Sequence, residues 1–599
     1  MSVRTLRWTL SVLCLLTALT ALAACSSAAT PAPQVAPTQA AKAPEPAKAT
    51  EAPKPAQPTP APAAQPTAVP ATKAAEQPKA ATSGSLPAGA APADKQVFRT
   101  IGIEGKHFDT SRNTYEANGM GLPAWEPLVN VGGDLKIRPG AADRWETSAD
   151  GLKWTFYLRK TAKWSDGSPV TAQDWVYTFQ RTLKKETANP YAWFYASINN
   201  AADYTAGKIT DPTQLGVRAV DDTTLEFTTK APTPYFLQIL AFPTSVPVQK
   251  KVVEKEGDAW ASKVETAISN GPFKIAEWQK GQSYTLVKNP EYNGPNPAKL
   301  EKVVVQFIPQ SSTPPTLQMF QANEIDYTSV DPTLLPQALA NPAFKDQLDV
   351  FPNFVTYYMY FNTDQPPFND KRVRQAFSHA IDREAIATQV MQGLDLPAYT
   401  HLPPGFLCNQ ANDPDVRKIQ AYDPALAKKL MADAGFPDGK GFPQLELWIR
   451  QGQVAREAEA VQRMLKQNLG VDVTVKDVER SLYMQKLGAK EITLGLIQWY
   501  YDYADPTNFM DWWTTGARHT WKNEEFNTLV KAAGTELDQT KRCKMYNQAE
   551  RILIEDVGAV FVAHPSMGEL WKPTVAGVQP NPDGKRVHYP IMFSDIYMK

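Results

Sequence analysis

A long segment rich in proline and alanine limits how this chain can fold. Between positions 26 and 95 the residues are mostly Pro, Ala, Thr, Lys, Glu and Gln, and large apolar side chains are scarce. Such a segment buries too little apolar surface to offset the conformational entropy lost on ordering, so we expect it to be disordered. Its prolines favour extended polyproline II, which rises about 3.1 Å per residue. We therefore predict a semi-rigid tether between a short leader and a globular body.

The leader has the features of a secretory signal. A start with two arginines is followed by a mostly apolar run over 8–22, which is short for a membrane-spanning helix. The run ends in Leu-Ala-Ala-Cys, which looks like a bacterial lipobox with Cys25 as the lipidated residue. We expect a lipoprotein signal peptide over 1–24 and a lipidated cysteine with its tether over 25–95, anchored to the cell membrane. The alternative is an ordinary signal peptide with an incidental cysteine.

Composition and motifs argue against several classes of function. Lys+Arg and Asp+Glu are both 62, which is unlike the basic surface of a nucleic-acid-binding protein. The sequence lacks the Gly-x-Ser-x-Gly, His-Glu-x-x-His and phosphate-loop motifs. Its six histidines are scattered, and no Cys/His cluster has zinc spacing. We predict that the protein is not an enzyme and has no catalytic residues, no cofactor and no bound metal.

Two cysteines remain in the body, at Cys408 and Cys543. Outside the cytoplasm they can form a disulfide, but sequence alone does not establish one. Two separately buried thiols are the alternative, and the pairing stays open at this point.

The globular body has about 500 residues, too many for one hydrophobic core, so at least two lobes are expected. Residues 224–228 alternate between polar and apolar side chains, and 303–308 are a β-branched run, so both predict strands. Residues 454–469 carry an apolar helical stripe that ends at Gly470, between strand patterns at 445–449 and 471–475. That strand–helix–strand order favours parallel pairing, and the class is mixed α/β.

Three segments carry a family likeness. The first, 154–174, contains Trp-Ser-Asp-Gly-Ser-Pro-Val-Thr and predicts a strand, an Asp-Gly turn and a helix capped near Thr171. The second, 361–383, places Asp370 at a helix N-cap before an apolar face. The third, 499–506, reads Trp-Tyr-Tyr-Asp-Tyr-Ala-Asp-Pro.

In this order and at these separations, the segments resemble the oligopeptide/dipeptide/nickel class of extracytoplasmic solute-binding proteins of bacterial ABC importers, family 5. The likeness covers about 97–599. It implies an α/β fold of the two-lobed periplasmic-binding-protein type (class II, cluster C), with an extra small domain and a two-stranded hinge that lets the lobes close on a ligand. The implied boundaries are lobe one at 97–352 and 566–599, its extra domain at about 131–215, lobe two at 353–565, and hinge crossings near 350–358 and 560–570.

The resemblance also implies a ligand anchor. In peptide-binding members, the aspartate of a Trp-x-x-Asp-Tyr motif pairs with the ligand's free α-amino group, and Asp502 is the matching residue. The alternative is that Asp502 only brackets its own loop. Trp499 carries over from the motif, although core packing is an equal alternative for it. Tyr500 and Tyr501 follow Trp499 along a strand, so one face of this run is expected to line the cleft.

Two further residues are placed only by their position in the chain. We expect Tyr115 and Trp125 of lobe one to supply the opposing wall of the cleft.

Two departures from the family pattern matter for specificity. Some oligopeptide binders carry an arginine for the ligand's carboxylate three residues before the motif tryptophan, where this chain has Leu496. The residue after the tryptophan is often a disulfide cysteine, and here it is Tyr500. Any Cys408–Cys543 bridge would therefore differ from the one common among relatives.

The expected protein is an extracytoplasmic, lipid-anchored monomer that holds a peptide as an added strand and delivers it to ABC permease and ATPase subunits. Alternatives within the family are oligosaccharide or nickel-complex binding. Alternatives outside it are a secreted lipoprotein hydrolase and a surface adhesin or sensor without transport.

Overall fold

The computed structural model describes residues 86–308, 315–330, 333–451, 454–516, 518–578, 580, 585 and 593–599. The expected signal peptide, Cys25 and most of the tether lie outside these residues. Across the described ranges, no helix combines the length and apolar character needed to cross a membrane.

The last residues of the predicted tether contact the folded body. Residues 86–95 are described, and the Ala91 amide donates to the Met598 carbonyl at 2.8 Å. The Gln96 side chain donates to the carbonyls of Ala91 and Met598. Backbone hydrogen bonds to the carboxyl-terminal residues thus order a stretch whose own side chains bury little surface.

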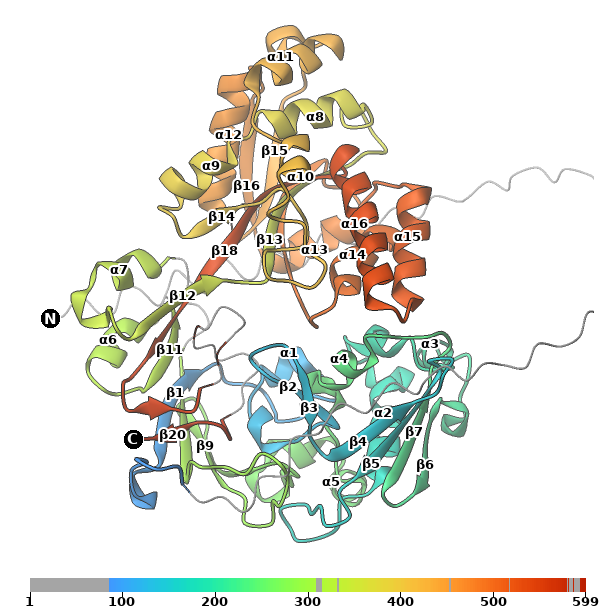
Figure 1. Cartoon of the computed structure of the whole chain (residues 1–599), viewed down its shortest axis with the longest axis vertical. Helices are drawn as coiled ribbons and strands as arrows, with labels where there is room; N and C mark the ends of the chain where they lie inside the picture. Colours follow the sequence, from blue (N-terminus) through green and yellow to red (C-terminus); the bar gives the residue numbers. More distant parts are fainter. Residues whose placement is uncertain are drawn as a thin grey trace, which may run out of the picture. The chain divides into compact units, whose positions relative to one another are not determined.

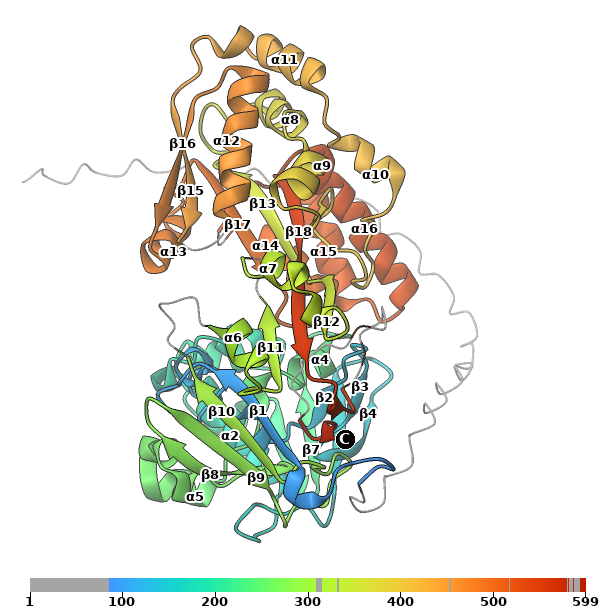
Figure 2. The same ribbon diagram turned by 90° about the vertical axis from the view of Figure 1, so that its left-hand side faces the viewer.

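The first lobe contains a four-stranded sheet in the order β1-β10-β9-β8 (Figure 2). β1 and β10 are parallel, and the other neighbours are antiparallel. The β-branched run predicted as a buried strand is β10, with Val303 and Val305 in the core. The strands are β1 (Val97–Gly102), β8 (Phe273–Gln279), β9 (Ser283–Lys288) and β10 (Lys302–Phe307).

A second four-stranded sheet of the first lobe has the order β4-β5-β7-β6. It covers the region where the extra domain was expected, about 131–215, and extends beyond it. β7 pairs with both β5 and β6, so the sheet continues to Thr228. Its strands are β4 (Ala142–Thr147), β5 (Lys153–Leu158), β6 (Val217–Asp221) and β7 (Thr224–Thr228), and a hairpin of β2 (Val129–Val131) and β3 (Ile137–Pro139) precedes it.

The predicted turn and capped helix that follow β5 are confirmed. Gly167 has a φ of +83°, which suits glycine in the Asp-Gly turn. Helix α2 (Ala172–Leu183) starts with a capping box in which Asp174 accepts from the Thr171 amide at 2.8 Å. Trp164 donates to the same carboxylate at 3.2 Å, which ties the turn to the helix.

The second lobe carries most of an eight-stranded sheet in the order β11-β18-β13-β17-β15-β16, with β12 and β14 also paired to β18. The predicted strand–helix–strand unit is confirmed: β15 (Leu445–Arg450) and β16 (Val473–Val478) are parallel, and α12 (Ala455–Leu469) connects them. Gly470 ends α12 in the left-handed conformation, at a φ of +70°.

One long strand, β18 (Ala559–Trp571), connects the two lobes (Figure 1, Figure 2). Its first part pairs with β13 (Val355–Phe361), and its second part pairs with β12 (Leu348–Pro352) and β11 (Tyr327–Val330). The two expected hinge crossings therefore fall on neighbouring antiparallel segments. On the other crossing, a short break at residues 353–354 separates β12 from β13.

The predicted N-cap and apolar face of the second motif are confirmed. Asp370 accepts from the Arg372 amide at 2.8 Å at the start of α8 (Lys371–His379). The face formed by Val373, Phe377 and Ala380–Ile381 is fully buried. It packs in one core cluster with α12 and β15.

Cys408 and Cys543 form a disulfide in the structure. It connects the loop before α10 (Pro414–Ile419) to α16 (Gln539–Glu555). The remaining helices are α1 (Thr114–Ala117), α3 (Ala201–Thr205), α4 (Phe236–Leu240), α5 (Lys250–Glu256), α6 (Thr316–Gln321), α7 (Leu335–Ala340), α9 (Arg383–Ala385), α11 (Pro424–Asp433), α13 (Arg480–Gly488), α14 (Pro506–Thr515) and α15 (Glu524–Thr535), and the remaining strands are β14 (Asp395–Pro397), β17 (Leu494–Tyr500), β19 (Val575–Ala576) and β20 (Tyr597–Met598).

Candidate functional site

The Trp-Tyr-Tyr-Asp motif lies at the end of β17, where the strand leaves the sheet. Trp499 and Tyr501 are nearly buried, at 6% exposure each, whereas Tyr500 between them is 41% exposed. This alternation is the one predicted for an extended segment. Leu496 is fully buried on the opposite face of the strand from Trp499, in the core that includes α8 and α12.

Asp502 lies two residues beyond the end of the strand and is held by residues from both lobes. Its Oδ1 atom accepts a hydrogen bond from the Tyr191 hydroxyl of lobe one at 3.1 Å. Its Oδ2 atom accepts from Asn508 Nδ2 at 3.3 Å, and its amide donates to Asn508 Oδ1 at 3.0 Å. Trp499 Nε1 also donates to Asn508 Oδ1, at 3.1 Å. Asn508 on α14 therefore fixes the aspartate relative to the motif tryptophan.

The electrostatic environment of Asp502 favours a cation. Burial raises the pKa of its carboxyl, and hydrogen bonds from Asn508 and Tyr191 and the charge of Arg518 only partly offset this. Among the described residues, no lysine, arginine or histidine lies within ion-pair distance of it. A half-buried carboxylate with donors but no counter-ion is stabilised by a positively charged ligand group.

A second carboxylate of the same motif shows the contrast. Asp505, three residues later, is buried and accepts two charge-assisted hydrogen bonds from Arg542, with Nη1 2.6 Å from Oδ2. It also caps α14 by accepting from the Thr507 amide. Asp505 is therefore a structural residue, whereas Asp502 has no such charge partner among the described residues.

Lobe one contributes aromatic rings next to Asp502. Burial, and then the charge of Asp502, raise the pKa of the Tyr191 hydroxyl, so it remains a neutral donor. The Tyr115 ring lies 5.5 Å from the Tyr191 ring and is 54% exposed. The Arg480 guanidinium of lobe two lies 5.9 Å from the Tyr115 ring centre. Tyr115 is thus next to the aspartate's hydroxyl partner.

Trp125 occupies a different part of the site. It is nearly buried, its Nε1 donates to the Ile268 carbonyl at 3.1 Å, and its ring packs edge-on against Trp260. It therefore combines a core position with a surface that faces the cavity beside Asp502.

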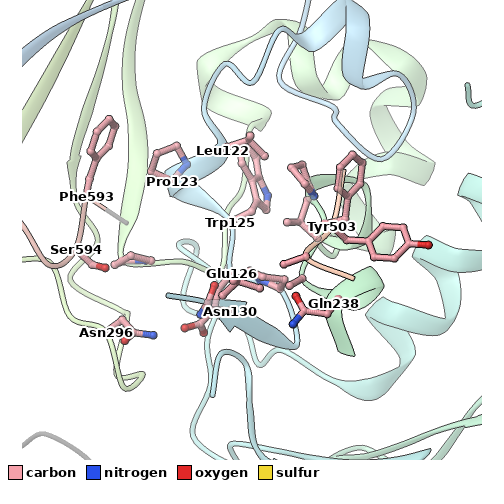
Figure 3. Close-up of a pocket in the computed structure, with 18 of the residues that line it drawn as sticks. Leu122, Pro123, Trp125, Glu126, Asn130, Gln238, Asn296, Tyr503, Phe593 and Ser594 are labelled. Carbon is pink, nitrogen blue, oxygen red and sulfur yellow. The ribbon is translucent and has the colours of Figure 1, made fainter. Parts of the chain in front are cut away.

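A cavity with about 1100 Å³ of empty space, part of it open to solvent, lies next to this aspartate. Figure 3 shows Trp125, Glu126 and Tyr503 among the side chains around it. Glu126 is already paired with Arg159 at 2.8 Å and with Tyr292, so its charge is satisfied. The full lining is Leu122, Pro123, Trp125–Pro127, Asn130, Val131, Leu135, Gln238, Ala241–Pro243, Val246, Pro272, Phe273, Asn296, Tyr501–Ala504, Phe593 and Ser594.

The structure thus places the predicted residues in two groups. Trp125, Tyr501 and Asp502 line the cavity, while Tyr115, Trp499 and Tyr500 do not. Each of these three contacts a neighbour of the cavity or of Asp502. The Tyr115 ring contacts the Tyr191 ring, and the Tyr500 ring stacks on Tyr501. Trp499 donates a hydrogen bond to Asn508.

Sequence reasoning missed Tyr191 and Asn508. Tyr191 is 311 residues from Asp502, and nothing in its local sequence points to that contact. Asn508 is on the helix directly after the third motif, so its position near Asp502 was a signal that could have been used. Within the described ranges, no group of three or more His, Cys, Asp or Glu residues could hold a metal ion.

Comparison with known proteins identifies the family. Residues 136–521 match the bacterial extracellular solute-binding proteins, family 5 Middle. The chain belongs to this family. The resemblance inferred from the three motifs is confirmed, and so is the two-lobed α/β fold.

The similar proteins cover most of the chain. The periplasmic oligopeptide-binding protein OppA of Salmonella typhimurium is 35% identical over 508 residues, which is 83% of this chain and 92% of that protein. The probable deoxycholate-binding periplasmic protein YgiS of Escherichia coli is 33% identical over 512 residues, 83% of this chain and 93% of that one. The structure of Listeria monocytogenes OppA bound to peptide has a TM-score of 0.64 at 28% identity, and covers 84% of this chain and 99% of that chain.

Proposed function

We propose that this member of the family binds peptides outside the cell and delivers them to the permease and ATPase subunits of an ABC importer. The observation that carries the proposal is the half-buried Asp502 carboxylate, which has two hydrogen-bond donors, lines a cavity and has no cationic partner in the described part of the chain. A peptide's α-ammonium group supplies the missing charge. Two of the similar proteins bind peptides according to their names.

The edge of β17 supports the same ligand. β15 pairs with β17 only at Leu494 and Gly495, whereas β13 pairs with it from Leu494 to Tyr500. The edge from Leu496 to Tyr500 therefore has no strand on its second side within the described ranges. An extended peptide can add there through main-chain hydrogen bonds, with its amino end at Asp502.

The negative charge of Asp502 favours a peptide over the other ligands known or expected in this family. A neutral oligosaccharide has no cation to offer the carboxylate, and a nickel complex would need its own set of contacts. Deoxycholate, the ligand in the name of one similar protein, is an anion and would be repelled by it. We propose binding rather than catalysis, with the protein acting as a monomer.

The test is mass spectrometry of small molecules released when the purified protein is denatured. A mixture of short peptides is expected from the wild type, and Asp502→Asn is expected to release far less of it. Asp505→Asn is not a suitable control, because Asp505 holds α14. Glu524→Gln, at an exposed carboxylate of lobe two on α15, controls for the loss of one negative charge. Sugars, a metal chelate or bile acids in place of peptides would overturn the proposed ligand.

The membrane anchor is a separate part of the proposal. We propose that Cys25 is lipidated and that residues beyond it hold the body away from the membrane. Metabolic labelling with a fatty-acid analogue should mark the wild type and not Cys25→Ser. Equal labelling of both would contradict an anchor at this cysteine.

A further inference from the structure

Two arginines of lobe two place their positive charges close to a third. Arg450 ends β15, Arg480 begins α13, and Arg518 follows α14. Burial lowers the pKa of Arg450, and the charges of Arg480 and Arg518 lower it further. Arg480 and Arg518 are therefore each close enough to act on the charge of Arg450, although the three residues come from separate elements.

Arg518 and Arg480 are held by rings rather than by carboxylates. The Arg518 guanidinium lies 4.2 Å from the Trp512 ring centre and 5.6 Å from that of Trp499, and Arg480 lies over Tyr115. Within the described part of the chain, neither arginine has a carboxylate within 4.0 Å. Stacking on rings leaves the N–H groups at the guanidinium edge available to an anion.

The nearest acidic neighbour in sequence does not neutralise Arg480. Glu479 caps α13, and its carboxylate accepts from the amides of Ser481 and Leu482 and from the Ser481 hydroxyl. The positive charge of Arg480, which is exposed, therefore stays directed at the region of Tyr115.

Both arginines are connected to Asp502 by short chains of contacts. On one side, the Tyr191 hydroxyl donates to Asp502, and the Tyr191 ring lies 5.5 Å from the Tyr115 ring. The Arg480 guanidinium lies over that Tyr115 ring. On the other side, Asn508 joins Asp502 to Trp499, on which Arg518 lies. The charge of Arg518 acts on the Asp502 carboxyl. The site thus combines the Asp502 carboxylate with the arginine guanidinium groups. This arrangement is complementary to a ligand that carries a positive charge at one end and a negative charge at the other.

We infer that Arg480 and Arg518, with Arg450 beside them, form an anion subsite for the carboxyl end of a short peptide whose amino end is at Asp502. This inference rests on the proposed peptide-binding function. It assigns carboxylate recognition to residues other than position 496, where Leu496 is buried in the core and cannot contact a ligand. An extended peptide advances about 3.4 Å per residue, so the separation of the subsite from Asp502 sets the length of peptide that can reach both.

The test compares free-acid and amidated alanine peptides of two to five residues by isothermal titration calorimetry. In the wild type, at least one length is expected to bind as the acid at least about tenfold more tightly than as the amide, which corresponds to one charge-assisted contact. Arg518→Gln and Arg480→Gln are each expected to lower this ratio towards one by weakening binding of the acid. Arg518→Lys, which keeps the charge, should retain part of the preference.

Arg463→Gln is the matched control, because Arg463 is an exposed arginine of lobe two on α12. It should leave the acid-to-amide ratio unchanged. Equal affinities of acids and amides in the wild type would overturn the anion subsite while leaving Asp502-dependent peptide binding intact. A preference that survives both glutamine variants would also overturn it. Failure of every peptide to bind the wild type would overturn the proposed function and the subsite together.

Discussion

At the scale of single residues, Asp502 combines a functional advantage with a cost in stability. Its pKa is raised above the unfolded value by burial. A carboxyl with a raised folded pKa contributes stability below its unfolded pKa, and that contribution is lost as pH rises through the folded pKa. At neutral pH the ionised, unpaired group therefore destabilises the ligand-free protein.

Asp502→Asn should consequently weaken peptide binding and stabilise the empty protein. We expect the affinity for a peptide ligand to fall about 10- to 100-fold, as for the loss of a hydrogen bond to a charged group. The thermal midpoint of the ligand-free variant should exceed that of the wild type at pH 7, and the difference should disappear below the pKa of an unfolded aspartate. Calorimetry at both pH values measures this. A variant less stable than the wild type at pH 7 would mean that Asp502 mainly supports its own loop.

At the scale of elements, the loop before α10 is attached to α16 at two points. The Cys408–Cys543 disulfide is one, and it closes a loop of 135 residues. The second is Glu550 on α16, which accepts from the amides of His401 and Leu402 at 2.9 and 2.8 Å. The two attachments act on the same segment, by restricting the unfolded chain and by satisfying buried amides.

Replacing both cysteines by serine should lower the free energy of unfolding by about 2–5 kcal/mol, as expected for a crosslink across a long loop. Urea unfolding of Cys408→Ser/Cys543→Ser measures the loss. The wild type treated with a thiol reductant should show a similar loss. If the double variant and the wild type unfold at the same urea concentration, the crosslink does not contribute to stability.

The buried Glu550 carboxyl on α16 should make the stability of the protein depend on pH. Burial raises the pKa of this carboxyl to about 7, above its unfolded value of about 4.5. The folded state therefore holds this proton over that interval, and the group's contribution falls as pH rises from 4.5 to 7. Glu550→Gln should gain stability relative to the wild type as pH rises across this interval, by about 3 kcal/mol in total. Parallel stability curves for the two proteins would contradict a raised pKa.

At the scale of the whole molecule, three buried histidines couple the core of lobe two to acid unfolding. Burial lowers the pKa of His401 and His519 to about 3, and that of His564 to about 4. The unfolded chain binds these protons near pH 6.5, so their contribution to stability is complete above that pH and is lost as pH falls towards 4. The Trp513 ring stacks on His519 at 4.2 Å, so His519→Phe retains the ring contact.

His519→Phe should reduce the loss of stability between pH 6.5 and 4 by about 2–4 kcal/mol. Denaturant unfolding over this pH range measures the slope. His379→Phe is the control, because His379 is hydrogen-bonded to the Ala421 carbonyl outside this histidine group. If His519→Phe shows the same acid slope as the wild type, His519 does not titrate on unfolding.

The sequence determined the local elements because their signals are local. Capping residues at Thr171 and Asp370, the glycine that ends α12, and the strand–helix–strand order of β15 to β16 follow from chain chemistry over a few residues. The three motifs also identified the family, because their order and spacing extend over the whole body. The hydrogen bond from Ala91 to Met598 and the pairing of β7 could not be predicted, because both depend on distant strands.

The site itself was decided mostly by tertiary structure. Asp502 could be found from its motif, but its partner Tyr191 comes from 311 residues away. Arg480 and Arg518 carry no local signal, and only folding places Arg480 over Tyr115 and Arg518 over Trp499. The same holds for the Cys408–Cys543 bond, which sequence left open. Local chemistry sets caps, turns and strand patterns, whereas a binding site depends on which distant segments the sheets and helices bring together.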